Sequence, residues 1–240
     1  MRIACLFSGG KDSALALLCA LQSGYRVERL LTMLPRADSY MFHHPNVRWA
    51  REQAKAIGIP IVMKKIEAPS EDKEGEIREM RNAIANLNVG GVVSGAVASE
   101  YQKEKIDLVC EELGVASLAP LWKKNQEALL RESVGAGFGV IITRVAADGF
   151  DESWLGRKID ERCVDDLLKL NKKFGVSLCG EGGEFETFVA RAPFFKKKIE
   201  IEKSRKVWKG ASGELVIEKV ILKELEASLP NFRDEIAKDL

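Results

Sequence analysis

Residues 8–13 join a short apolar segment to a longer one near the N-terminus. Residues 3–7 have the pattern of a buried strand, and residues 14–21 have the pattern of a helix packed on a sheet. The junction reads Ser-Gly-Gly-Lys-Asp-Ser, so a glycine turn connects the expected strand to the expected helix. A strand, a tight turn and a helix in this order predict the beginning of an α/β fold, and no other feature restricts the fold as strongly.

This turn has the composition of a phosphate site. Its two glycines let the backbone approach a ligand closely, and successive N–H groups in such a turn attract an anion together with the helix N-terminus. Lys11 adds a cation, and Asp12 beside a phosphate is explained by Mg²⁺, whose shell holds carboxylate and phosphate oxygens together. An ordinary strand–helix turn with a polar cap is the alternative, and the complete hexapeptide argues against it. The expected phosphate and Mg²⁺ ligands are Ser8, Gly9, Gly10, Lys11, Asp12 and Ser13.

The segments that follow alternate between strand and helix patterns up to residue 114. The expected strands are 27–33, 61–65 and 91–94, and the expected helices are 47–57, 76–87 and 101–113. This alternation predicts a doubly wound parallel sheet of the Rossmann-like type, with right-handed crossovers. Ligands of such sheets bind outside the carboxyl ends of the strands, which places residues 8–13, 33–46 and 94–100 at the expected site.

The pattern changes near residues 118–122. Beyond them, helices at 126–135 and 160–174 and strands at 139–145, 198–202 and 214–222 predict a smaller α+β unit. We therefore expect a nucleotide-binding domain at residues 1–119, a second domain at residues 120–225 and a charged C-terminal tail at residues 226–240.

Composition excludes several classes of protein. With 37 basic and 36 acidic residues, no global field attracts nucleic acid or an anionic membrane. No apolar run approaches the ~20 residues of a membrane span, and the N-terminus lacks a signal-peptide pattern. The five cysteines are scattered and form no Cys-x-x-Cys pair, so a zinc or iron–sulfur site is not expected. We expect a cytoplasmic protein with reduced thiols.

Residues 179–187 form a second unusual stretch, Cys-Gly-Glu-Gly-Gly-Glu-Phe-Glu-Thr. The alternation of Glu184, Phe185 and Glu186 predicts a strand with both carboxylates on one face. Paired carboxylates that face a cleft suit a metal, a cationic substrate or an ammonium nucleophile. A solvated acidic loop is the alternative.

The two motifs together resemble the diphthine–ammonia ligase family. The first motif is shared by the PP-loop, or N-type, ATP pyrophosphatases, and the second is specific to the family. Further matching pieces are Met41-Phe42-His43, Ser94-Gly95-Ala96, Tyr101-Gln102 and Trp154-Leu155-Gly156-Arg157. The resemblance covers residues 1–222 in one continuous order. It implies a PP-loop ATPase fold for the first domain.

The resemblance also implies a reaction, the last step of diphthamide biosynthesis. The family amidates diphthine, a modified histidine on translation elongation factor 2, with ATP and ammonia. ATP would adenylate the diphthine carboxylate and release pyrophosphate, and ammonia would then displace AMP. Free ammonium is the expected nitrogen donor, because no glutaminase module is evident in the sequence.

Roles for further residues follow from the resemblance. Met33 would lie at the adenine, and Ser94 and Gly95 at the ribose or α-phosphate. His43 would stabilise the α-phosphate or help a proton leave ammonium, with an ordinary surface histidine as the alternative. The expected substrate-binding residues are Glu181, Gly182, Gly183, Glu184, Glu186, Trp154 and Arg157, and the expected catalytic residues are Lys11, Asp12, His43, Glu184 and Glu186.

Two of these assignments have direct competitors. Trp154 would hold the quaternary ammonium against its ring, or it would be a core residue. Arg157 would bind the substrate carboxylate, or it would pair with Asp160.

Two other functions compete with the ligase. A PP-loop enzyme that modifies RNA would use the basic stretch of residues 196–209, although such a stretch is more often the solvated side of strands. Nucleic acid is therefore not the expected partner. The other competitor is a non-catalytic ATP-binding module, which would need no second acidic motif.

Overall fold

The structure is a computed structural model that describes residues 1–34, 46–69 and 72–225. The expected tail of residues 226–240 and the piece that contains His43 lie outside the described residues.

The N-terminal half is built on a five-stranded sheet in the order β3-β2-β1-β4-β5, and every pairing in it is parallel. Its strands are β1 (Arg2–Leu6), β2 (Arg26–Leu34), β3 (Ile61–Lys65), β4 (Gly91–Val93) and β5 (Ala116–Leu118). The chain winds outward from β1 in both directions, so the predicted doubly wound sheet is confirmed. The switch point lies at the carboxyl end of β1, where open α/β sheets bind ligands. The short β5, with its half-buried Ala-Ser-Leu sequence, was not predicted because three residues carry no periodic pattern.

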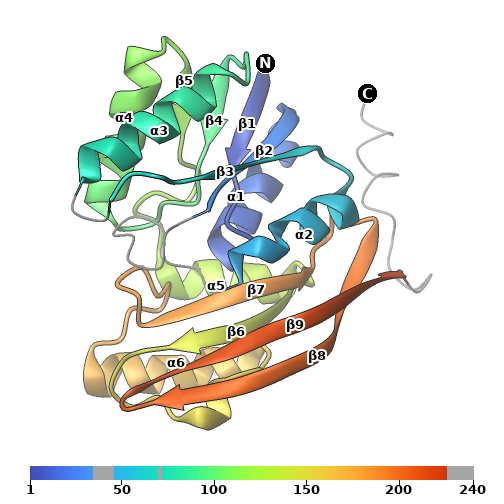
Figure 1. Cartoon of the computed structure of the whole chain (residues 1–240). Helices are drawn as coiled ribbons and strands as arrows, with labels where there is room; N and C mark the ends of the chain where they lie inside the picture. The colour runs from blue at the N-terminus through green and yellow to red at the C-terminus, as the bar shows by residue number, and fades with distance from the viewer. Residues whose placement is uncertain (35–45, 70–71, 226–240) are drawn as a thin grey trace.

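Helices cover both faces of this sheet (Figure 1). They are α1 (Lys11–Gln22), α2 (Ala50–Ile57), α3 (Lys73–Ala85) and α4 (Glu100–Glu112), and the 3₁₀ helix η1 (Val47–Trp49) precedes α2. The helices α1 and α2 lie on the side of the second sheet, and α3 and α4 lie on the opposite side. The start of α3 was predicted at residue 76, three residues too late. The Asp72 carboxylate accepts the Gly75 N–H at 2.8 Å and so caps the helix before its apolar pattern begins.

The C-terminal half is built on a four-stranded antiparallel sheet in the order β7-β6-β9-β8. Its elements are α5 (Gln126–Gly135), β6 (Gly139–Val145), η2 (Glu152–Trp154), α6 (Glu161–Phe174), β7 (Phe185–Arg191), β8 (Lys197–Lys209) and β9 (Ser212–Glu224). The strands β8 and β9 are much longer than predicted. The added residues are mostly polar, and opposite charges pair across the hairpin, as Lys203 does with Glu218 at 2.9 Å.

The two halves share one core. The larger apolar cluster contains Leu17 of α1 and Ala54 of α2 together with Leu167 of α6 and Phe188 of β7. A smaller cluster lies between the parallel sheet and α3 and α4, around Met80 and Val109. The second sheet is therefore packed against the back of the helices that leave β1 and β2. Among the described residues, no helix has the length and apolarity needed to cross a membrane.

Candidate active site

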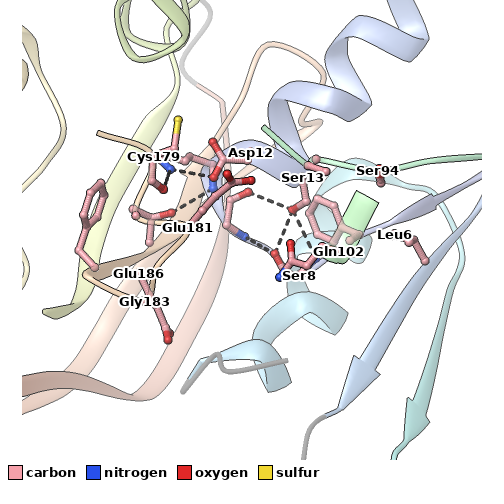
Figure 2. Close-up of a pocket in the computed structure, with 18 of the residues that line it drawn as sticks. Leu6, Ser8, Asp12, Ser13, Ser94, Gln102, Cys179, Glu181, Gly183 and Glu186 are labelled. Atoms are coloured by element: carbon pink, nitrogen blue, oxygen red, sulfur yellow. Dashed lines mark hydrogen bonds and ion pairs between the residues drawn. The ribbon is translucent and has the colours of Figure 1, made fainter. Parts of the chain in front are cut away.

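A cavity of about 520 Å³ lies at the carboxyl ends of β1, β2 and β4. Both halves of the chain contribute to its walls. In Figure 2, Ser8, Asp12 and Ser13 of the glycine turn lie between two groups of residues. One side is formed by the acidic motif, with Cys179, Glu181, Gly183 and Glu186, and the other by Leu6, Ser94 and Gln102. The two sequence motifs therefore meet at the switch point of the parallel sheet.

Hydroxyl groups hold the glycine turn in shape. The Ser13 hydroxyl donates to the Gly10 carbonyl at 3.0 Å, and it lies 3.2 Å from the Ser8 hydroxyl. Gly10 is the N-cap of α1 and has an extended backbone, so the helix begins at Lys11 with its N-terminus beside the cavity. Both serines line the cavity, as the sequence predicted.

Gly9 differs from its neighbours in the turn, because it is not among the described residues that line the cavity. Its φ of +84° requires glycine. Its carbonyl accepts the Val189 N–H at 3.0 Å and the Gln53 amide at 2.8 Å. A Cβ at this position would lie 2.1 Å from the Gln53 Oε1 atom. Gly9 therefore docks the turn onto α2 and β7.

The Lys11 side chain is almost entirely buried, with 5% exposed. Its Nζ atom donates to Asp12 at 2.7 Å and to the Cys179 carbonyl at 2.5 Å. Burial, the largest single influence, lowers the pKa of Lys11, but attraction to Asp12 and to neighbouring groups such as Glu181 together outweighs it, so that pKa lies above its usual value. The ammonium is therefore charged at neutral pH and fixed in place at the wall of the cavity.

The second domain also reaches the first turn of α1 through Thr187 of β7. The Lys11 N–H donates to the Thr187 hydroxyl oxygen at 3.0 Å. Thr187 lies in the acidic motif and lines the cavity, but the sequence analysis gave it no role. No local signal predicts a contact between residues that are 176 positions apart.

Glu181 connects the acidic motif to the loop after β4. One of its carboxylate oxygens accepts the Val97 N–H at 2.7 Å, and the other accepts the Ala98 N–H. The same loop packs closely on α1, because a Cβ on Gly95 would lie 2.6 Å from the Ser13 nitrogen. Both Glu181 and Gly95 line the cavity, and each carboxylate oxygen of Glu181 accepts one hydrogen bond from this loop.

The carboxylates of Glu184 and Glu186 do not share a face, contrary to the prediction. The strand β7 begins at Phe185, so Glu184 precedes the strand and turns away, and its Oε1 atom accepts the Ser177 N–H at 3.2 Å. Its Oε2 atom is buried without a hydrogen-bond partner among the described residues. Of these two carboxylates, only that of Glu186 lies among the described residues of the cavity wall, with 8% of the residue exposed.

Trp154 and Arg157 lie away from the cavity as the described residues define it. The Trp154 ring packs against Phe150 at 5.0 Å between centroids. The Arg157 guanidinium lies 4.6 Å above that ring and binds Asp166 at 2.6 Å. The expected alternative partner Asp160 instead caps α6. The predicted roles of Trp154 and Arg157 in substrate binding have no support in this geometry.

The remaining predicted residues lie at the cavity. Met33, Gly182 and Gly183 line it, and so does Ser94, whose buried hydroxyl has no hydrogen-bond partner among the described residues. An unpaired buried hydroxyl in a cavity wall fits a polar ligand.

Besides Thr187, sequence reasoning missed two residues that shape the site. Arg144 lines the cavity from β6. The sequence could have indicated it, because it is the single charged residue in a predicted strand of mostly apolar residues. Gln126, the first residue of α5, accepts the N–H groups of Leu178 at 3.0 Å and Cys179 at 3.3 Å. Gln126 thereby orients the carbonyl that binds Lys11.

Comparisons with known proteins agree with this architecture. Residues 1–117 match the family described as diphthamide synthase N-terminal domain, and residues 125–222 match the diphthamide synthase C-terminal domain. The diphthine–ammonia ligase of Bos taurus is 35% identical over 89% of this chain and 87% of that protein. The enzyme of Mus musculus is 33% identical over 100% of this chain and 99% of its own length. The Schizosaccharomyces pombe enzyme is 34% identical over 92% of this chain but only 39% of its own length. The chain therefore belongs to the diphthamide synthase family.

Proposed function

We propose that this chain is a diphthine–ammonia ligase, which uses ATP to convert the carboxylate of a diphthine-modified protein into an amide with ammonium. The protein substrate we propose is elongation factor 2. One observation carries the proposal: a single cavity joins a glycine turn of phosphate-site composition to a second-domain wall that carries charged side chains of both signs.

The glycine turn is the proposed triphosphate site. The start of α1, the Ser8 and Ser13 hydroxyls and the charged Lys11 all lie at one end of the cavity. The unpaired Ser94 hydroxyl is available to the ribose or the α-phosphate, and Met33 lies at the end of β2, where we place the adenine.

Asp12 is the proposed protein ligand of Mg²⁺. The described residues contain no group of three or more histidine, cysteine or acidic side chains that could hold a metal by themselves. One carboxylate is nevertheless a suitable donor, because Mg²⁺ at nucleotide sites is bound by one or two carboxylates, phosphate oxygens and water. When bound, Mg²⁺ would neutralise charge on the phosphates.

The chemistry assigns different tasks to the two ends of the cavity. We propose that Lys11 and the N–H groups at the start of α1 hold the β- and γ-phosphates and stabilise the departing pyrophosphate. The α-phosphorus then faces the diphthine carboxylate, and ammonia displaces AMP from the adenylated carboxylate. Glu186 is the proposed ligand of the cationic group, and the proposed role of His43 concerns a part of the chain outside the described residues.

The direct test is incubation with elongation factor 2 that bears diphthine, with ATP, Mg²⁺ and ammonium, followed by intact mass measurement. The expected product has the mass change of an O–H group replaced by NH₂, and it depends on ammonium. ATP labelled in the γ-phosphate should give labelled pyrophosphate. Label in free phosphate with stoichiometric ADP, in a preparation without pyrophosphatase, would contradict the proposed cleavage.

The RNA-modifying alternative receives no support from the basic stretch near the C-terminus. Several of its cations are paired within the β8–β9 hairpin, such as Arg205 with Glu218 at 3.0 Å and Lys197 with Glu224 at 2.7 Å. A cluster that is neutralised by its own carboxylates is a weak phosphate-binding surface.

A further inference from the structure

Three charged residues form a row across the second sheet. Arg144 of β6 lies directly opposite Glu186 of β7 in the register and directly opposite Glu214 of β9. Residues that lie opposite each other on neighbouring strands share one face of the sheet. The Arg144 guanidinium accordingly lies 3.3 Å from Glu186 and 3.7 Å from Glu214.

Two of the three residues reach the cavity: Arg144, in the middle of the row, and Glu186, on the edge strand β7. Arg144 and Glu186 both line the cavity, and 24% of the Arg144 side chain is exposed. A guanidinium has five N–H donors in a planar fork. Within the described part of the chain, Arg144 makes one hydrogen bond, from Nη1 to Glu186, and a longer ion pair from Nε to Glu214. Donors therefore remain for a ligand in the cavity.

The charges of the row indicate which ligand it suits. One guanidinium between two carboxylates has an excess of negative charge, so a triphosphate placed against it would be repelled by Glu186 and Glu214. A group that carries a carboxylate and a quaternary ammonium finds both opposite charges side by side. Diphthine has these two groups.

Arg157 offers a direct comparison. It was the arginine expected to bind the substrate carboxylate, but its guanidinium is occupied by Asp166 at 2.6 Å and lies over the Trp154 ring. Arg144 instead lies in the cavity wall, where its hydrogen bond to Glu186 is longer, at 3.3 Å.

We propose that Arg144 binds the carboxylate of the diphthine side chain, that Glu186 and Glu214 orient Arg144, and that Glu186 lies beside the trimethylammonium group. This inference rests on the proposed function. It assigns substrate recognition to a row of residues on the second sheet, opposite the phosphate turn, and it makes Arg144 a specificity-determining residue.

The test measures binding separately from turnover. Elongation factor 2 with diphthine, and the same protein with unmodified histidine, are titrated with the full chain in the presence of a non-hydrolysable ATP analogue. The variants are Arg144→Gln, which removes the fork and the charge, and Arg144→Lys, which keeps a charge between the two carboxylates. Arg157→Gln is the matched control, because it removes an arginine outside the cavity. Thermal unfolding of each variant, together with its affinity for the ATP analogue alone, verifies the fold.

We expect Arg144→Gln to weaken binding of the diphthine-bearing protein about ten- to hundredfold, because a charge-assisted fork to the carboxylate is lost. Arg144→Lys should weaken it less, because a point charge replaces the fork. Both variants should keep the affinity for the ATP analogue within about twofold, and Arg157→Gln should bind like the parent chain.

Parental affinity of either folded Arg144 variant for the diphthine-bearing protein would overturn the assignment. An equal loss of affinity for the ATP analogue would also overturn it and would place Arg144 at the phosphates. A parent chain that does not distinguish the diphthine-bearing protein from the unmodified one would contradict both the assignment and the proposed substrate. If binding depends on Arg144 as expected but the parent forms no amide, the proposed reaction fails and the assignment of Arg144 stands.

Discussion

The environment of Lys11 fixes its charge over a wide range of pH. Burial opposes the ammonium, and the adjacent Asp12 carboxylate together with neighbouring groups such as Glu181 more than offsets burial, so the pKa of Lys11 is raised. A cation with a raised pKa is protonated below that pKa and loses its contribution only as the pH rises through it. Any phosphate contact made by this ammonium should therefore persist at mildly alkaline pH.

We predict that deprotonation of Lys11 does not change the affinity for ATP between about pH 7 and about pH 9. Calorimetric titration of the parent chain and of Lys11→Arg, which does not titrate in this range, should give parallel profiles. Lys11→Met should bind ATP more weakly at every pH. An affinity that falls in the parent but not in Lys11→Arg would show that Lys11 loses its proton in this range.

Glu184 and Glu186 should respond differently to the same substitution. Glu186→Gln removes a negative charge from the cavity wall and from the ion pair with Arg144, so we predict a loss of amidation of at least about tenfold. Glu184→Gln keeps an acceptor oxygen for the Ser177 N–H, and we predict amidation close to that of the parent. Steady-state rates with saturating ATP measure both effects. Equal losses of amidation rate in the two variants would show that Glu184 also acts at the substrate site.

At this scale, the residues that the sequence predicted well are those whose signal is local. The glycine turn lies between a strand and a helix, so its position at a sheet edge follows from its neighbours alone. Arg144 and Thr187 were missed because their roles depend on pairings between strands and between halves of the chain. The partner of Arg157 was missed because Asp166 lies six residues beyond the expected Asp160, nearly two turns along α6.

The beginning of α5 acts on the site through a loop. Gln126 accepts two backbone N–H groups of the segment that presents the Cys179 carbonyl to Lys11. Loss of that acceptor would leave both N–H groups without their partner and would loosen the contact with Lys11.

We predict that Gln126→Met lowers the free energy of unfolding by about 1–3 kcal/mol and also raises the KM for ATP. Gln126→Glu is the matched control, because it keeps an acceptor oxygen at the same distance along the side chain. Denaturant titration and steady-state kinetics measure the two effects. If the Met variant is less stable but has the parental KM, Gln126 supports the fold alone.

The accuracy of the element predictions followed the length of the periodic pattern. The strand 139–145 and the helix 126–135 were predicted at their observed bounds, since apolar residues recur along their full length. The expected helix 47–57 is divided into η1 and α2, and β8 and β9 extend well beyond their apolar parts. Paired charges sustain that extension, and such pairing is visible only once the register is known.

The whole molecule is joined by its shared core and by polar contacts at the glycine turn. Gln53 is fully buried on α2, and its amide nitrogen donates to the carbonyls of Gly9 and Val189, both at 2.8 Å. One side chain therefore connects the glycine turn of the first half to β7 of the second. The domain boundary between residues 119 and 120 remains a prediction, because one apolar cluster contains residues from both sides of it.

We predict that urea unfolds residues 1–225 in one transition, followed equally by far-ultraviolet circular dichroism and by tryptophan fluorescence. Trp49 reports on the first half, and Trp154 and Trp208 report on the second. Gln53→Leu should lower the free energy of unfolding by about 1–3 kcal/mol without separating the two probes. Two resolved transitions in the parent chain would show that the halves unfold independently.

The contact between Thr187 and the start of α1 limits which amino-acid substitutions these two positions can accept. The donor is the backbone N–H of residue 11, which every residue except proline supplies, so no replacement at position 11 can restore a lost partner. The whole constraint therefore falls on position 187, where serine is the one other side chain with a hydroxyl on Cβ. Because no change at position 11 can compensate, substitutions at position 187 should be tolerated less often than its place in the second half of the chain would indicate.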